Sequence, residues 1–107
     1  MAVELELAVL LSVLRLSDGA YGLSVREDVS ARLKHDYSIG AIYTTLDRLA
    51  SKKLLSAKTV EGTEERGRRF RRQYRLTASG HRALVAAQNR SAAMWNAAPA
   101  NLTPERT

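Results

Sequence analysis

Apolar residues recur along the first segment of the chain in a pattern that predicts a helix. Residues 3–16 (VELELAVLLSVLRL) are rich in Leu and Ala, which favour a helix at this length. Their apolar side chains form two faces: Leu7, Leu10, Leu11 and Leu14 on one, and Leu5, Ala8, Val9, Val13 and Leu16 on the other. A helix that is apolar around most of its circumference must be buried around most of it. We therefore expect the second of these faces to meet another subunit.

Two further helices are predicted in the first half of the chain. After the turn residues 17–19, apolar positions at four-residue steps predict a helix over about 23–33. Ser38 is a good N-cap for a third helix. One side of that helix is expected to hold Ile39, Ile42, Tyr43, Leu46 and Leu49. The opposite side is small, polar or cationic and holds Gly40, Ala41, Thr44, Thr45 and Arg48. Such a surface can approach another molecule closely.

The second half of the chain predicts a β-hairpin followed by a last helix. Residues 54–60 and 70–76 alternate in polarity around a polar stretch with Gly62 and Gly67, which is typical of a long hairpin. On its second strand we expect an inward face of Phe70, Tyr74 and Leu76. Thr77 can cap the last helix, in which a heptad-like seam is formed by His81, Val85, Gln88, Ala92 and Trp95. This seam predicts close pairing with another helix.

This order of elements predicts a mainly α fold with a β-hairpin wing, an α+β winged helix-turn-helix with a C-terminal dimerisation helix. We expect residues 1–76 to form the DNA-binding domain, 77–97 the dimerisation helix and 98–107 a disordered tail. In this plan the third helix enters the major groove, and the hairpin lies along the adjacent backbone or minor groove.

The charge distribution supports a polyanionic partner. The net charge of +6 is unevenly spread: residues 1–50 hold five basic and seven acidic side chains, whereas residues 51–107 hold twelve basic and four acidic ones. Nine of the basic side chains lie within residues 52–75. A basic patch this concentrated suggests a polyanionic partner, although a solvated loop is the alternative interpretation.

Composition and motifs argue against an enzyme. The chain has no Cys, which removes disulfides, thiolate metal sites and a Cys nucleophile, and which fits a cytoplasmic, nucleoid-associated location. Neither His35 nor His81 has suitably spaced partners for a metal site. The sequence also contains no nucleophile elbow and no phosphate-binding Gly-rich loop. We therefore expect no catalytic residues, no metal and no cofactor.

Three motifs resemble those of the PadR-type winged-helix transcriptional regulators. They are Ala20-Tyr21-Gly22, then Ser38-Ile39-Gly40-Ala41-Ile42-Tyr43 with Leu46, Arg48 and Leu49, and finally Gln73-Tyr74-Arg75-Leu76-Thr77-Ala78-Ser79-Gly80. The resemblance covers about residues 3 to 90. It implies a homodimer built by the terminal helix, with recognition helices in successive major grooves. One departure is Lys53, where the family usually has Gly. Either Lys53 is left-handed, at a cost of roughly 1 kcal/mol, or the helix ends differently.

Candidate DNA-binding residues come from the third helix and the hairpin. Gly40 and Ala41 allow the helix N-terminus to approach phosphate. Thr44, Thr45 and Arg48 are the candidates for contacts with base edges or with phosphate. Spacing alone assigns Tyr43 to the core, whereas the resemblance implies a DNA contact. The full set is Ser38, Gly40, Ala41, Tyr43, Thr44, Thr45, Arg48, Arg66, Arg68, Arg69 and Arg71.

The resemblance also implies a possible effector. Some small members of this family bind flat aromatic compounds between subunits, stacked on a Trp of the terminal helix. The matching wall residues here would be Leu5, Val9, Val13, Val85 and Trp95. The alternative for Trp95 is packing in the dimer interface.

The sequence thus predicts a dimeric, sequence-specific DNA-binding repressor acting at a palindromic operator. The alternative is a winged-helix module that binds protein or RNA without operator specificity. A protein-docking third helix would expose large apolar side chains, which the small, polar side of this helix lacks.

Overall fold

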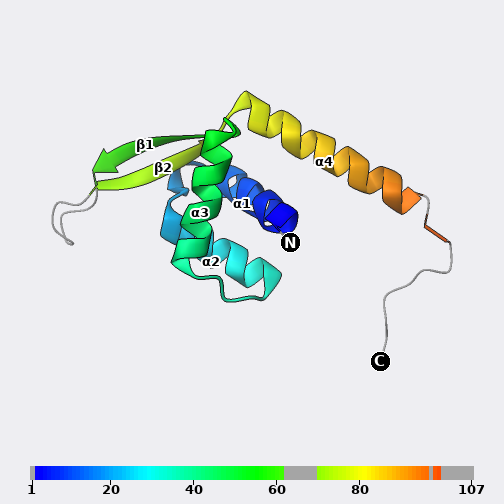
Figure 1. The fold of residues 1–107 in the computed structure, drawn as a ribbon, viewed down its shortest axis with the longest axis horizontal. Coiled ribbons are helices and arrows are strands. Elements are labelled where there is room, and N and C mark those ends of the chain that lie inside the picture. The colour runs from blue at the N-terminus through cyan, green and yellow to red at the C-terminus, as the bar shows by residue number, and fades with distance from the viewer. Residues whose placement is uncertain (1, 62–69, 97, 100–107) are drawn as a thin grey trace.

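The structure, a computed structural model, describes residues 2–61, 70–96 and 98–99. Its elements are α1 (Ala2–Leu16), the 3-10 turn η1 (Ser17–Gly19), α2 (Gly22–Leu33), α3 (Ile39–Ser51), β1 (Leu55–Glu61), β2 (Phe70–Leu76) and α4 (Ala78–Asn96). Helices α1, α2 and α3 form the body, from which the hairpin and α4 project toward opposite sides (Figure 1). The predicted mainly α fold with a two-stranded hairpin is confirmed. Residues 100–107 of the expected tail lie outside the described residues.

The core lies where α1, α2 and α3 meet the base of the hairpin. It consists of Val9, Leu10, Val13, Ala20, Val25, Val29, Ile42, Leu46, Leu49, Leu55, Tyr74 and Leu84. Tyr74 is the hairpin's main contribution, and burial raises the pKa of its hydroxyl above the ordinary value. The expectation that the second face of α1 meets another subunit is wrong at Val9 and Val13, because both are covered by the chain's own core.

An ion-pair cluster joins α1 to α2. The Asp28 carboxylate pairs with Arg15 from α1 and lies 3.1 Å from Nε of Arg32, one turn along α2. Burial alone would raise the pKa of Asp28, but the hydrogen bonds from the arginines outweigh it and lower the pKa below its ordinary value. The charged form of Asp28 therefore stabilises the fold at pH values above the ordinary pKa of an Asp side chain. This contribution is lost as the pH falls through the lowered pKa of Asp28.

The hairpin is fastened to the body through its second strand. Strands β1 and β2 pair antiparallel, from Leu55 opposite Leu76 to Glu61 opposite Phe70. The Tyr74 N–H donates to the Ala20 carbonyl at 2.9 Å, so the short segment before α2 adds a bridge to the edge of β2. The sequence carries no signal for this bridge, because a single pair of residues has no periodicity.

Side chains of β2 hold the same junction and correct one expectation. Gln73 Nε2 donates to the Asp18 carbonyl at 2.6 Å, and the Arg75 guanidinium pairs with the Asp18 carboxylate at 2.6 Å. The expected inward face is right at Tyr74 but wrong at Phe70, which is 71% exposed. Phe70 pairs with Glu61 at the end of the hairpin opposite to the Leu55–Leu76 pair.

The connection from α3 to α4 depends on Lys53, Thr77 and Gly80. Lys53 has φ 66°, and the Leu54 N–H donates back to the Leu49 carbonyl at 3.0 Å, which closes the helix end. The Thr77 hydroxyl donates to the Lys53 carbonyl at 2.8 Å and accepts from the Gly80 N–H at 2.9 Å, as expected for its capping role. A Cβ on Gly80 would lie 2.2 Å from the Leu54 carbonyl oxygen, so only Gly fits there.

Within the described residues, no helix is both long and apolar enough to cross a membrane.

The left-handed backbone at Lys53 predicts that Lys53→Gly stabilises the protein by about 0.5–1 kcal/mol, because Gly adopts this conformation without a Cβ penalty. Lys52 is the matched control: its φ of −79° is right-handed, so Lys52→Gly should lower stability. Chemical denaturation of both variants measures the difference. Equal shifts for the two would contradict the assignment.

Candidate nucleic-acid interface

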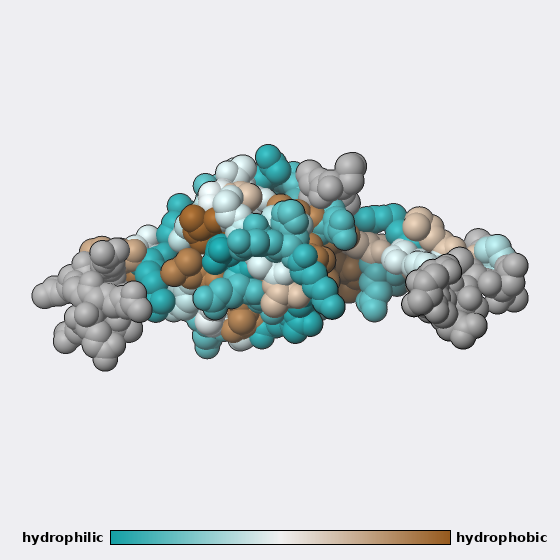
Figure 2. All heavy atoms as spheres, turned by 90° about the horizontal axis from the view of Figure 1, so that it is seen from below, coloured by the Kyte–Doolittle hydropathy of each residue, from teal (hydrophilic) through white to brown (hydrophobic). Residues whose placement is uncertain are grey.

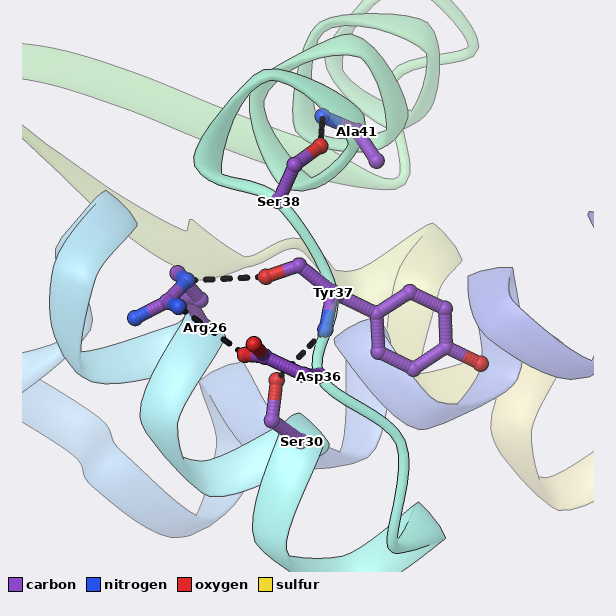
Figure 3. Close-up of polar contacts among 6 residues, drawn as sticks. All are labelled: Arg26, Ser30, Asp36, Tyr37, Ser38 and Ala41. Atoms are coloured by element: carbon purple, nitrogen blue, oxygen red, sulfur yellow. Dashed lines mark hydrogen bonds and ion pairs between the residues drawn. The ribbon is translucent and has the colours of Figure 1, made fainter.

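Helix α3 begins at a cap that the sequence predicts. Ser38 is extended, with ψ 155°, and its hydroxyl oxygen accepts from the Ala41 N–H at 3.1 Å (Figure 3). This bond satisfies one of the free N–H groups in the first turn and leaves others directed beyond the helix end. The first turn carries the small exposed Gly40, where a Cβ would have no other group within 4 Å.

The turn between α2 and α3 is fixed by one arginine. Arg26 Nε donates to the Tyr37 carbonyl at 2.8 Å, and its Nη2 lies 3.0 Å from the Asp36 carboxylate. The Ser30 hydroxyl accepts from the Tyr37 N–H at 3.1 Å (Figure 3). These bonds satisfy the backbone of the turn from side chains of α2, so they set the direction in which α3 leaves it.

Helix α3 presents one continuous exposed side. Its members recur at steps of three and four residues: Gly40, Tyr43, Thr44, Asp47, Arg48 and Ser51. The opposite side is buried and contains Ile42, Thr45, Leu46 and Leu49. Both sets follow helical spacing, so the rotation of α3 is defined along its whole length. Asp47 is an exposed acid that the sequence interpretation missed, although its position three residues after Thr44 could have identified it.

Two residues lie on different sides from those expected. Thr45 is 4% exposed, so its expected place on the open side is wrong; its hydroxyl donates to the Ala41 carbonyl at 2.9 Å and is satisfied inside the helix. Tyr43, which spacing places on the apolar side, is 40% exposed. A polar residue enters the buried side here because the helix itself supplies its hydrogen-bond partner.

Tyr43 is supported by the first residue of α2. A Cβ built on Gly22 would lie 2.4 Å from Cζ and from the hydroxyl oxygen of Tyr43, so the ring occupies the space that any side chain at this position would need. Gly22 is buried while Tyr43 keeps part of its surface open. The glycine of the Ala20-Tyr21-Gly22 motif therefore positions a residue on the exposed side of α3.

Arg48 and the hairpin arginines supply positive charge. The Arg48 side chain is half-exposed, and its Nη1 lies 3.8 Å from a carboxylate oxygen of Glu6. On the hairpin, Arg71 is exposed and its guanidinium lies 4.0 Å from the centre of the Tyr21 ring, a cation–π geometry that holds it beside the body. The other candidates on the hairpin, Arg66, Arg68 and Arg69, lie outside the described residues.

A separate apolar groove of about 580 Å³ lies between α1 and α4. Its walls include Leu7, Leu11 and Leu14 from α1, and Val85, Gln88 and Trp95 from α4. Figure 2 shows apolar atoms in the recess where α4 leaves the body. Leu11 and Leu14 are 42% and 47% exposed, so these two residues of the first predicted face are uncovered, whereas Leu10 of the same face is buried in the core.

The groove corrects the expected effector wall. Val85 and Trp95 line it, but Val9 and Val13 are wholly buried in the core and Leu5 packs against that core. These three α1 residues therefore do not line the groove of the single chain. Both faces of α1 are apolar, so the sequence pattern alone does not distinguish the face that lines it. In the part of the chain that the structure describes, no group of His, Cys, Asp and Glu side chains is arranged to hold a metal ion.

The described fold, a helix-turn-helix with an exposed third helix and a basic hairpin, defines the winged-helix class. The family model described as the transcriptional regulator PadR-like family matches residues 10–86. The chain therefore belongs to the PadR-like family, whose members are transcriptional regulators and not enzymes. No curated protein matches the chain.

Solved structures share the fold. A PadR family transcriptional regulator from Eggerthella lenta DSM 2243 is 24% identical, with a TM-score of 0.66 over 88% of this chain and 81% of that one. One from Clostridium difficile R20291 is 24% identical, with a TM-score of 0.63 over 84% and 91%. Bacillus subtilis PadR in complex with operator DNA is 21% identical, with a TM-score of 0.60 over 96% of this chain and 52% of that one.

The contact between Gly22 and Tyr43 predicts that Gly22→Ala lowers stability by about 1–3 kcal/mol, because the new methyl group must displace the Tyr43 ring. Gly40→Ala is the control, since nothing lies near that position and Ala favours a helix. In a Tyr43→Ala background the cost of Gly22→Ala should largely disappear, which a double-mutant cycle of unfolding free energies measures. An unchanged cost in that background would show that the ring is not the cause.

Proposed function

We propose that this regulator binds double-stranded DNA with α3 in the major groove. The observation that carries the proposal is the exposed side of α3, where Tyr43 is accompanied by small, polar or charged side chains. A side of this kind fits a groove whose base edges offer donors and acceptors. Thr44 is the proposed base contact, Asp47 matches the amino group of cytosine, and we assign Arg48 to a phosphate beside the groove.

Backbone contacts complete the proposed interface. The N-terminus of α3, with Ser38, Gly40 and Ala41 in its first turn, offers N–H groups and the positive end of the helix dipole to a phosphate. Among the described residues of the hairpin we assign a phosphate contact to Arg71, which is exposed, and we give Arg66, Arg68 and Arg69 the same role. Phosphate contacts position the protein, whereas the base contacts from α3 give sequence specificity.

We further propose that the protein acts as a homodimeric repressor. Residues 1–76 would form the DNA-binding unit and 77–97 the dimerisation helix, with a second copy covering the groove between α1 and α4. The seam of His81, Val85, Gln88, Ala92 and Trp95 is exposed, which supports this arrangement. A two-fold dimer matches a palindromic operator, and occupancy of a site that overlaps a promoter blocks polymerase in the cytoplasm, where the nucleoid lies.

The same groove supports a second proposal, control by a small aromatic effector. Its volume is within the range of small-molecule sites, and Trp95 offers a flat apolar surface for stacking. Leu7, Leu11 and Leu14 replace Leu5, Val9 and Val13 as the α1 side of the site. Quenching or a spectral shift of Trp95 fluorescence by an aromatic compound tests this role, and a screen without a response contradicts it.

Adjacent threonines provide the test of base recognition. A duplex selected from a random library by the wild-type protein is compared with an unrelated duplex. Thr44→Val should reduce discrimination between the two by roughly 5–30-fold, because it removes an exposed hydroxyl from the proposed contact. Thr45→Val makes the same chemical change one residue later, at a buried position, and should leave discrimination unchanged.

Two outcomes would overturn the proposal. Equal losses on the selected and the unrelated duplex with Thr44→Val would remove α3 from base recognition. Selection of no duplex by the wild-type protein, combined with binding to structured RNA or to a protein, would favour the alternative module without operator specificity.

Dimerisation through the groove predicts that Leu11→Asp converts a dimer into a folded monomer, because a buried unpaired carboxylate in the interface carries a large desolvation cost. Leu23→Asp is the control, since Leu23 is an exposed leucine of α2 outside the groove. Sedimentation measures the mass, and circular dichroism checks the fold. A monomeric wild-type protein, or a Leu11→Asp dimer of unchanged strength, would contradict the proposed interface.

A further inference from the structure

Glu6 of α1 faces two cations, Arg48 in α3 and Lys52 at the C-cap of that helix. Its carboxylate oxygens lie 3.3 and 3.4 Å from Nζ of Lys52, and one of them lies 3.8 Å from Nη1 of Arg48. The two cations are four residues apart, so they lie one above the other on the same side of α3. The single negative charge of Glu6 is therefore shared by two positive charges at the C-terminal end of α3.

The exposure of these side chains is unequal. The side chain of Glu6 is 18% exposed, whereas those of Arg48 and Lys52 are half-exposed. Glu6 is thus held by its surroundings, while both cations keep part of their surface toward solvent. A phosphate or base can reach them from that side without displacing α1.

Arg48 belongs to the exposed side of α3, and Lys52 directly follows the end of the helix. In the proposed complex with DNA, both are placed to contact an anion. Each contact with a phosphate must then be made in competition with the Glu6 carboxylate, because both anions favour the same donors. A cation already paired with a carboxylate also releases fewer counterions when it meets DNA.

We propose that Glu6 is an internal competitor of DNA that restrains Arg48 and Lys52 and so limits sequence-independent affinity. This inference rests on the proposed DNA-binding function. The carboxylate lowers the electrostatic contribution of the cations common to all duplexes. It leaves the contacts of Thr44 and Asp47 with base edges as the source of discrimination.

Replacement of Glu6 by its isosteric amide tests the proposal. Binding of the full-length protein to a fluorescent unrelated duplex is measured by anisotropy at 50 and 200 mM salt. Glu6→Gln should bind more tightly than wild type. The quantity to compare is the affinity of Glu6→Gln divided by the affinity of the wild-type protein. For each additional phosphate that the variant neutralises, this ratio should be about threefold larger at 50 mM than at 200 mM salt, because the slope of log affinity against log salt steepens by about 0.9.

Glu4→Gln is the matched control for net charge. Glu4 also lies on α1 and is exposed, and it forms no ion pair with the residues that the structure describes. Its replacement should change affinity much less than that of Glu6. Glu6→Asp keeps the charge and should stay close to wild type. Thermal unfolding of each variant confirms that the protein remains folded at the temperature of the assay.

A protein that lacks both cations shows whether the gain in DNA affinity comes from Arg48 and Lys52. In a protein that already carries Arg48→Gln and Lys52→Gln, Glu6→Gln should give no further gain in affinity. A gain that persists there, equal gains for Glu6→Gln and Glu4→Gln, or weaker binding by Glu6→Gln would each overturn the inference. A wild-type protein that binds no duplex at all overturns the proposed function itself, which the Glu6 comparison alone does not.

Discussion

The burial of one side of α3 is the interaction on which the rest of this structure depends. Ile42, Leu46 and Leu49 are fully buried, and each contributes about 1.5–3 kcal/mol relative to an exposed side chain. Rotation of α3 would expose all three together, so the helix has one orientation against α1 and α2. The direction of Thr44 and Arg48 follows from this packing. The burial of the apolar side of α3 therefore determines which side of the helix is exposed.

The two projecting elements are attached to the body by close backbone contacts near the base of the hairpin. The hairpin is fixed where Tyr74 bonds to Ala20, and α4 begins where Gly80 lies against the Leu54 carbonyl. Neither attachment covers the leucines of α1 that face the groove. A domain of this size buries a limited share of its surface, so an uncovered apolar groove fits a protein that completes its core with a partner.

The charged side chains fall into two groups, those that hold elements of the fold together and those that remain exposed. Asp18 and Asp28 engage arginines that hold elements together, and Arg26 fixes the turn before α3. Arg71 and Arg48 instead remain exposed on the surface proposed to meet DNA. Glu6 lies at the boundary between the two groups, because it is partly covered by the body and yet is paired with cations of the exposed helix.

The sequence by itself determined the elements, the Ser38 and Thr77 caps and the family, because capping residues and periodic apolar patterns act over a few neighbouring positions. Only the tertiary structure decided that Thr45 is buried, that Val9 and Val13 belong to the core, that Phe70 is exposed and that Lys53 is left-handed. The pairing of Glu6 with Lys52 likewise joins residues 46 positions apart. A helix with two apolar faces, or a hydroxyl that its own backbone can satisfy, has no single preferred side until its neighbours in space are present.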